Sequence, residues 1–190
     1  MFTLLFCCLA AADVYHVKFS VQVRKGDLRD FVVEVHPSWA PLGAARFAEL
    51  VDANFFSGCR FFRVVENFVA QFGISGKPGG AAWEPIPDDP VVETNAKYTV
   101  TFATSGPDSR TTQIFVNLAD NSRLDAMSFA PFGKVISGSE VVDAIYSGYG
   151  EKPQQARIRE EGNAYLKKQF PNLSYVAEVA RLDGSPAEEP

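Results

Sequence analysis

Apolar and polar residues alternate in two segments near the start of the chain, "VYHVKFSVQV" (14–23) and "FVVEV" (31–35). Alternation with a period of two is typical of β-strands that bury one face. The intervening segment "RKGDLRD" contains Gly26 and Asp27, a pair that favours a tight turn. We therefore expect an antiparallel hairpin at the start of the domain.

The pattern changes to helical spacing in the segment "HPSWAPLGAARFAELVDANFF" (36–56). Ser38 and Pro41 are residue types that begin helices. Apolar residues at helical spacing follow and form the expected buried stripe, which consists of Leu42, Ala45, Ala48 and Val51. We expect an amphipathic helix that lies across a sheet or across the end of a barrel.

Strand patterns return in five further segments, which are "CRFFRVV" (59–65), "FVAQFG" (68–73), "KYTVTFAT" (97–104), "QIFVNLA" (113–119) and "FGKVIS" (132–137). The connection 74–96 is long and rich in turn residues. Loops beyond about 12–15 residues usually have a function or short structure of their own. Within this loop, Asp88 and Asp89 lie between prolines, and we expect a solvated turn rather than an acid–base pair or a Ca²⁺ site.

The C-terminal part predicts two more helices and a last strand. "GSEVVDAIYSGYG" supplies one helix with the apolar stripe Val141, Val142 and Ile145, and "ARIREEGNAYLKKQF" supplies a weaker one that ends before Pro171. "SYVAEVARL" (174–182) has the pattern of a strand. Many short strands with few helices favour a closed or nearly closed antiparallel barrel, because closure removes exposed edges. A doubly wound sheet is disfavoured because strands and helices do not alternate regularly.

Length and charge narrow the class of function. A chain of 190 residues fits one domain rather than two. The formal net charge of −5 argues against a primary partner with a phosphate backbone, so nucleic acid is not expected. Sixteen phenylalanines are many for this length and predict a phenylalanine-rich core or groove.

The first twelve residues, "MFTLLFCCLAAA", carry no charge and are nearly all apolar. They are too short to cross a bilayer, which takes about 20 residues. They resemble a signal peptide with Ala10 and Ala12 at the cleavage site, although no basic region precedes them, and a buried N-terminal strand is the alternative. We expect a secreted or secretory-pathway protein if residues 1–12 are a leader, and a cytoplasmic one otherwise.

Loss of this leader would leave Cys59 as the single cysteine, so no intrachain disulfide could form. We expect Cys59 to be buried as a small apolar side chain. His16 and His36 have no further ligand at metal-binding spacing, so no metal site is predicted. In the secretory pathway, Asn172 in the triplet Asn-Leu-Ser would be a glycan acceptor.

One cation, Arg63, lies in the apolar strand pattern "RFFRVV". Strand alternation places Phe61, Arg63 and Val65 on one face and the residues between them on the other. An arginine side chain is a permanent cation with a fixed fork of donors, and it cannot serve as an acid or a base. Any role of Arg63 is therefore electrostatic or hydrogen-bonding.

Three blocks of the chain resemble the signature blocks of the cyclophilins, which are peptidyl-prolyl cis-trans isomerases. The blocks are "FFRVVENFVAQFG" (61–73), "ATSGPDSRTTQIFVN" (103–117) and "LDAMSFAPFGKVISGSEVVDAI" (124–145), and the resemblance covers roughly residues 15–150 in matching order. It implies a closed eight-stranded antiparallel barrel capped by two helices, to which this chain adds a C-terminal helix and strand. We expect an isomerase domain over residues 13–182, and the composition of 183–190 predicts a disordered tail.

The resemblance implies roles for individual residues. The catalytic set would be Arg63, Phe68 and Gln71, and the substrate-binding set would be Val69, Ala103, Thr104, Gln113, Phe115, Leu124 and Phe129. The family's pocket histidine falls on Phe129 or, because this block is one residue longer, on Ser128. Many members carry tryptophan where this chain has Arg123, so the resemblance does not extend to binding of the inhibitor cyclosporin.

The chemistry of prolyl isomerisation suits these residue types. Rotation about an X-Pro bond crosses a barrier of about 18–20 kcal/mol without any covalent change, so no cofactor is needed. A guanidinium that donates to the proline nitrogen would bind the twisted state better than either planar state. The predicted substrates are X-Pro-containing polypeptides, whose folding the enzyme would assist, and we expect a monomer that does not associate with membranes once the leader is removed.

Two other function classes stay open. The first is a non-catalytic module that binds proline-containing peptides in the same groove, an alternative motivated by Arg123 and Phe129. The second is a lipocalin-like barrel with an interior ligand. The many large Phe and Leu side chains at strand positions disfavour the hollow core that such a barrel requires.

Overall fold

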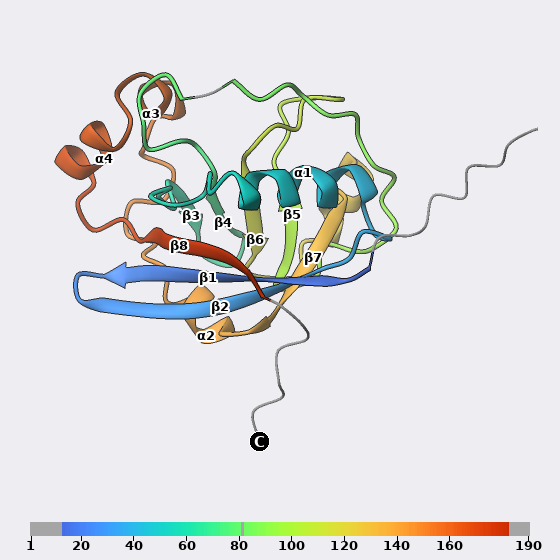
Figure 1. Ribbon diagram of the computed structural model, residues 1–190. Coiled ribbons are helices and arrows are strands. Elements are labelled where there is room, and N and C mark those ends of the chain that lie inside the picture. Colours follow the sequence, from blue (N-terminus) through green and yellow to red (C-terminus); the bar gives the residue numbers. More distant parts are fainter. Residues whose placement is uncertain (1–12, 81, 183–190) are drawn as a thin grey trace, which may run out of the picture.

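Eight strands form a single antiparallel sheet in the computed structural model, which describes residues 13–80 and 82–182 (Figure 1). The strands are β1 (Tyr15–Arg24), β2 (Asp27–Val35), β3 (Arg63–Val65), β4 (Val69–Phe72), β5 (Thr99–Phe102), β6 (Ile114–Asn117), β7 (Pro131–Ser137) and β8 (Tyr175–Leu182). Their order across the sheet is β3-β4-β6-β5-β7-β2-β1-β8. The mainly β class is confirmed, and every segment predicted as a strand contains one. The expected leader (1–12) and tail (183–190) lie outside the described residues.

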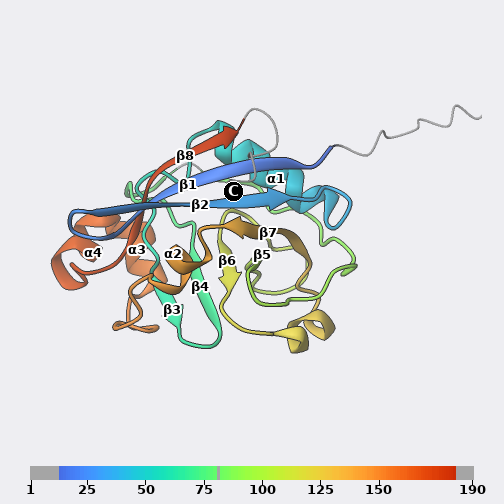
Figure 2. The ribbon, with the colours of Figure 1, turned by 90° about the horizontal axis from the view of Figure 1, so that it is seen from below.

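The expected regular closure of the barrel is not observed among the described strands. The sheet curls round, and its two edge strands, β3 and β8, are joined only by a bridge between Arg60 and Tyr175 and by neighbouring backbone hydrogen bonds (Figure 2). In one of these, the backbone N–H of Phe61 donates to the carbonyl of Ser174 over 3.0 Å. A continuous ladder fails because β3 has only three residues. β8 is therefore the eighth strand of the sheet, not an addition to eight others.

Phenylalanine side chains fill the inside of the curled sheet, as the composition predicted. The fully buried rings are those of Phe19, Phe31, Phe47, Phe56, Phe61, Phe62, Phe72, Phe102 and Phe132. Phe19 and Phe31 stack with their ring centroids 5.0 Å apart. Cys59 is fully buried among these side chains, and burial raises the pKa of its thiol to about 12. This packing leaves no basis for the lipocalin-like alternative.

Helix α1 (Pro41–Asp52) packs against β7 and β8, but through a different face from the one predicted. Its buried residues are Gly43, Ala44, Arg46, Phe47, Leu50 and Val51. The predicted stripe is wrong for Leu42, which is 43% exposed, and for Ala45, which is also exposed. The large side chains of Phe47 and Leu50 set the buried face, because they remove the most apolar area from water.

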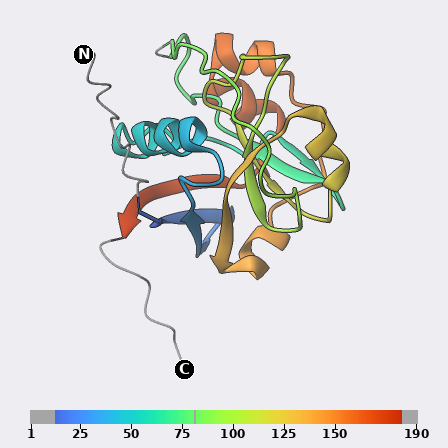
Figure 3. The ribbon, with the colours of Figure 1, turned by 90° about the vertical axis from the view of Figure 1, so that its right-hand side faces the viewer.

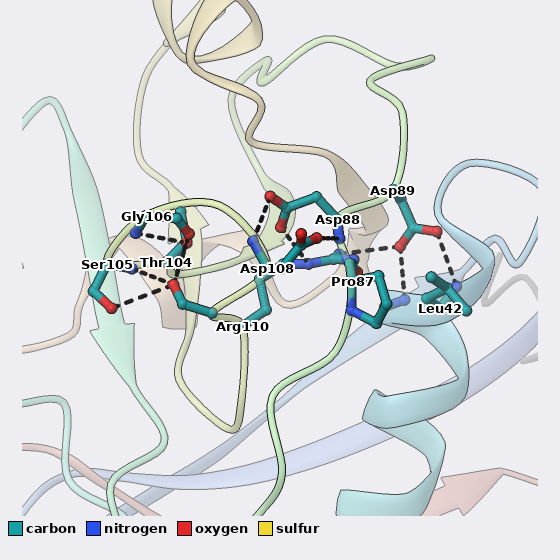
Figure 4. A network of polar contacts seen from close by, with 11 residues as sticks. Leu42, Pro87, Asp88, Asp89, Thr104, Ser105, Gly106, Asp108 and Arg110 are labelled. Carbon is teal, nitrogen blue, oxygen red and sulfur yellow. Dashed lines mark hydrogen bonds and ion pairs between the residues drawn. The ribbon is translucent and has the colours of Figure 1, made fainter.

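The N-terminus of α1 is capped by Asp89, which the sequence placed in a solvated turn. Asp89 is only 4% exposed, and its carboxylate accepts hydrogen bonds from the backbone N–H groups of Leu42 (3.0 Å) and Gly43 (2.8 Å) (Figure 4). It also pairs with Arg110 over 3.0 Å. Ser38 makes no capping bond, since the residue at the cap position is Ala40. The solvated-turn prediction is therefore wrong, and Asp89 fastens the 74–96 loop to the barrel.

The C-terminal part contains α2 (Ser139–Asp143), α3 (Gln155–Glu161) and α4 (Asn163–Gln169) before β8. The predicted stripe of α2 is buried. The single helix expected over "ARIREEGNAYLKKQF" is instead two helices, because the chain turns at Gly162 with φ of 61°. A Cβ atom there would lie 2.4 Å from the carbonyl oxygen of Gly76, so the site requires glycine.

Helices α3 and α4 stand together beside the 74–80 segment (Figure 3). They bury a second apolar cluster outside the barrel, formed by Phe62, Ile74, Ile158, Tyr165, Leu166, Phe170 and Leu173. The 3₁₀-helix η1 (Ser122–Met127) lies between β6 and β7 along the chain. None of the helices in the described part of the chain is long and apolar enough to cross a membrane.

Candidate functional site

Nine of the ten predicted site residues line a single pocket with a volume of about 230 Å³. They are Arg63, Phe68, Val69, Gln71, Ala103, Thr104, Phe115, Leu124 and Phe129. The tenth, Gln113, lines the neighbouring hollow, but its side-chain oxygen accepts a hydrogen bond of 3.0 Å from the amide of Gln71. The structure therefore brings together residues from three sequence blocks that are far apart along the chain.

The polar side of the pocket follows from strand register. Arg63 on β3 pairs with Gln71 on β4, and Gln71 pairs in turn with Phe115 on β6. Directly opposed residues project from the same face of a sheet, so these three side chains form one row. The predicted grouping of Phe61 with Arg63 is wrong. Phe61 belongs to the barrel core with Val64, because the regular strand begins only at Arg63.

Arg63 is held from two sides. Its Nη1 donates to the side-chain oxygen of Gln71 (3.1 Å), and its Nε donates to a carboxylate oxygen of Glu151 (2.5 Å). The Arg63 side chain is 28% exposed, so the guanidinium still faces the pocket and solvent. Glu151 follows the α2 region and has no motif around it, so sequence patterns gave no signal for this contact. The fork of Arg63 is thus oriented before any ligand arrives.

Two cations contact the ring of Phe68. The guanidinium carbon of Arg63 is 5.4 Å from its ring centroid, and that of Arg123 is 4.7 Å away. Such contacts contribute about 0.5–1 kcal/mol each at exposed positions. Arg123, which departs from the usual tryptophan, therefore contributes to holding the Phe68 ring.

The apolar side of the pocket is a small cluster separate from the barrel core. Val69, Phe115 and Leu124 are buried, and the less buried Phe129 packs edge-on against Phe115 with ring centroids 5.8 Å apart. Of the two candidates for the histidine position, Phe129 faces the pocket. Ser128 is exposed and ends η1 with φ of 64°.

A polar network behind this wall fixes its backbone. The side-chain amide of Asn95 donates to Asp125 (2.7 Å) and to the carbonyl of Phe129 (2.8 Å). The amide of Asn121 donates to the carbonyl of Phe68 over 2.8 Å. Burial acts to raise the pKa of the Asp125 carboxyl, but hydrogen bonds from Thr94 and Asn95 outweigh it and hold that pKa below the usual value.

The lowered pKa of Asp125 predicts an acid-sensitive pocket wall. A carboxyl whose pKa is depressed by folding stabilises the protein above its unfolded value of 3.8, and this contribution is lost as the pH falls through the folded-state pKa. We expect wild type to lose more free energy of unfolding than Asp125→Asn between about pH 5 and about pH 3. Urea unfolding at both pH values measures this difference. Parallel losses in the two proteins would contradict it.

The third wall comes from the backbone after β5. The N–H of Ala103 donates to the carbonyl of Gln113 over 2.9 Å, and the hydroxyl of Thr104 contacts that of Ser109 over 2.7 Å. The 104–110 turn is anchored by Arg110, whose guanidinium pairs with Asp88 and Asp89 and also donates to the carbonyl of Pro87 (Figure 4). This network connects the pocket wall to the start of α1.

The complete pocket combines a cation, an amide and an apolar hollow. It offers hydrogen-bond donors at one end and room for one small apolar ring at the other. Gln155 at the start of α3 also lines it, a contact that no sequence pattern indicated. Within residues 13–80 and 82–182, no group of three His, Cys, Asp or Glu side chains could hold a metal ion.

Comparison with known proteins gives the family. The model of the "Cyclophilin type peptidyl-prolyl cis-trans isomerase/CLD" family matches residues 18–162. The chain belongs to the cyclophilin family. The matched span includes every pocket residue named above and ends before α4.

Named relatives agree with this assignment. A peptidyl-prolyl cis-trans isomerase of Acinetobacter baylyi is 38% identical over 129 residues, which are 64% of this cyclophilin and 69% of the relative. Peptidyl-prolyl cis-trans isomerase 10 of Caenorhabditis elegans is 33% identical over 61% of this chain and 75% of its own. The cyclophilin is thus a peptidyl-prolyl cis-trans isomerase.

A solved structure supports the fold alone. The crystal structure of a cyclophilin-type isomerase of Cryptosporidium parvum matches with a TM-score of 0.69 at 15% identity. It covers 91% of this cyclophilin and all of the other chain.

Proposed function

We propose that this cyclophilin isomerises X-Pro bonds in the pocket around Arg63, with the guanidinium donating to the proline nitrogen. The observation that supports this proposal is the row of Arg63, Gln71 and Phe115, set by strand register, at the edge of an apolar hollow. The proline ring would lie on Phe115, between Val69 and Phe129. Arg63 would then be in reach of the bond that rotates.

The barrier to rotation comes from amide resonance. In the twisted state the proline nitrogen becomes pyramidal and gains a lone pair that can accept a hydrogen bond, whereas in the planar states this lone pair is delocalised. A donor at that position therefore binds the transition state more tightly than the ground state, which is the condition for catalysis. Arg63 suits the role because it donates in a fixed direction and keeps its charge.

One hydrogen bond does not supply the whole effect. An acceleration of about 10⁵-fold requires roughly 7 kcal/mol, whereas a hydrogen bond to a charged group contributes about 1.5–3 kcal/mol net. Anchoring of the peptide on either side of the proline must provide the rest. Gln71, Gln113 and the backbone at Ala103 and Thr104 are placed to hold the extended chain.

The direct test is exchange spectroscopy on a short X-Pro peptide. Catalytic amounts of wild-type protein should broaden the separate NMR signals of cis and trans proline and produce exchange between them. Without the protein, the two isomers interconvert only in tens to hundreds of seconds. Exchange no faster than in buffer would overturn the proposal. Tight binding without exchange would instead support the binding-module alternative, which the family relatives do not favour.

Orientation of Arg63 by Gln71 gives a further prediction. Gln71→Ala should lower kcat/KM for an X-Pro peptide about tenfold, because a partly buried hydrogen bond to a charged group is lost. Glu151→Gln is the matched control on the other side of Arg63, and it should change kcat/KM by less than about threefold because an exposed ion pair contributes little. Equal losses in the two variants would contradict this account.

The biological setting stays a prediction from sequence. We propose that the enzyme assists folding of X-Pro-containing polypeptides, acts as a monomer and enters the secretory pathway through residues 1–12. N-terminal sequencing of the mature protein tests the leader. We expect weaker cyclosporin binding than in family members that carry tryptophan at the position of Arg123.

A further inference from the structure

A second cleft, with a volume of about 830 Å³, lies beyond the Arg63 pocket. It is lined by Arg60 and by three segments: the tip of the β1–β2 hairpin, residues 143–148 from the end of α2 onward, and residues 171–173 with Tyr175 at the start of β8. Figure 1 shows the hairpin tip on the same side of the molecule as the start of β8. We call it the Arg60 cleft, because Arg60 lines it.

Arg60 is a buried cation without an acidic partner. It is 8% exposed, its Nη1 donates to the carbonyl of Leu173 (3.1 Å), and its Nε has no hydrogen-bond partner. Its guanidinium lies over the ring of Tyr175, 5.0 Å from the centroid. No carboxylate of residues 13–80 and 82–182 forms an ion pair with it. A buried charge that lacks a counter-charge is costly, and an incoming anion would compensate it.

The other charged residues that line the cleft do not offset the positive charge of Arg60. Lys25 at the hairpin tip is exposed and has no ion pair within the described part of the chain. Arg24 is already paired with Asp27 (3.2 Å). The acid in the lining, Asp143, is also occupied, because it accepts from Tyr98 (2.7 Å) and pairs with a lysine. The positive charges of Arg60 and Lys25 therefore remain uncompensated within the described part of the chain.

The Arg60 cleft continues towards the Arg63 pocket. It shares Ser147 and Gly148 with a shallow hollow that also contains Glu151, and Glu151 contacts Arg63 directly. Arg60 and Arg63 are three residues apart, so their Cα atoms are at most about 11 Å apart. A polypeptide held at Arg63 could reach the cleft within a few residues.

We propose that the Arg60 cleft binds carboxylate side chains of the polypeptide substrate, several residues away from the isomerised proline. The proposal rests on the isomerisation site at Arg63. The substrate of this family is a polypeptide, which extends past the pocket in both directions, and aspartate and glutamate supply the oxyanion that the two unpaired cations lack. The cleft thereby selects substrates with an acidic flank.

The test compares peptides with the same X-Pro core and either three Glu or three Gln residues, placed four to eight positions before or after the proline. Protein made in bacteria keeps Asn172, which also lines the cleft, free of glycan. For wild type at low salt we expect a Kd about fivefold lower for the acidic peptide on at least one side, and a smaller difference at high salt. Backbone amide signals of Gly26, Gly148 and Tyr175 should shift only with the acidic peptide.

Variants locate the effect. Arg60→Gln should abolish the preference for acidic peptides, and Lys25→Gln should reduce it by about half. Lys167→Gln is the matched control, because it removes the same charge from an exposed position on α4 outside the cleft. If Arg60→Gln fails to fold, the Lys25→Gln variant and the backbone amide shifts test the proposal in its place.

Equal Kd values for acidic and neutral peptides on wild type would overturn the proposal. Equal losses in Lys25→Gln and Lys167→Gln would do the same, since they would indicate a general charge effect. Failure of the Arg63 site gives a different result, in which the neutral peptide is not isomerised at all. Isomerisation without a preference for acidic flanks counts against the Arg60 cleft alone.

Discussion

Replacement of Arg63 by alanine is expected to lower kcat/KM for X-Pro peptides by about 10²–10³-fold, the usual effect of removing one donor that acts on the transition state. The loss should appear mainly in kcat, because the guanidinium would bind the twisted state and not the planar ones. The apolar hollow formed by Val69, Phe115 and Leu124 would still hold the proline ring. Cis–trans exchange by NMR over a range of peptide concentrations separates kcat from KM.

Two variants control this measurement. Arg63→Lys keeps the charge but loses the planar fork, so it should recover only part of the activity. Arg123→Ala removes the other guanidinium that contacts Phe68, yet Arg123 does not line the pocket, so kcat should change by less than about threefold. Unchanged activity in Arg63→Ala, or equal losses in Arg63→Ala and Arg123→Ala, would rule out the assigned role of Arg63.

The second large effect concerns stability. Asp89→Ala should lower the free energy of unfolding by about 3–5 kcal/mol, because it removes one partner of a buried ion pair. Its carboxylate is 1% exposed and Arg110 is 4% exposed, so solvent cannot replace the lost contact. The N–H groups of Leu42 and Gly43 would also lose their acceptor at the start of α1. Urea unfolding followed by circular dichroism measures the change.

Asp30→Ala is the matched control for Asp89→Ala. Asp30 is half exposed and pairs with Lys18 over 3.6 Å, so its loss should cost less than about 1 kcal/mol. Asp89→Asn separates charge from capping, because the amide oxygen can still accept from the helix N-terminus. Similar free energies of unfolding for Asp89→Ala and Asp30→Ala would show that the buried ion pair and helix cap of Asp89 do not stabilise the fold.

The strands could be predicted because they depend on local periodicity, whereas the pocket residues followed from the resemblance to the cyclophilins. Alternation identified the segments that became β3, β4 and β6, and it is enforced by the pleat of the backbone. Register then aligned Arg63, Gln71 and Phe115. The block pattern of the chain also matched its family, so the pocket residues were found before their geometry was known.

The errors occurred where tertiary contacts outweigh local pattern. The spacing of apolar residues in α1 suggested that the face with Leu42 is buried. Phe47 and Leu50 have more apolar area to bury, so the face that carries them packs against the sheet instead. Asp89 lies in a segment with the composition of a turn, yet its side chain is buried because it pairs with Arg110 and caps the N-terminus of α1. Gly162 divides a helix that the periodicity treated as continuous.

By itself the sequence determined the fold class, the order of the strands along the chain, the family and the residues of the pocket. Only the tertiary structure decided that Glu151 and Gln155 adjoin the pocket and that Arg60 is buried without a counter-charge. The physical reason is the range of the interactions. Strand periodicity is set within a few residues, whereas the contact between Arg63 and Glu151 spans 88 positions and exists only after the sheet has curled and its edges have met.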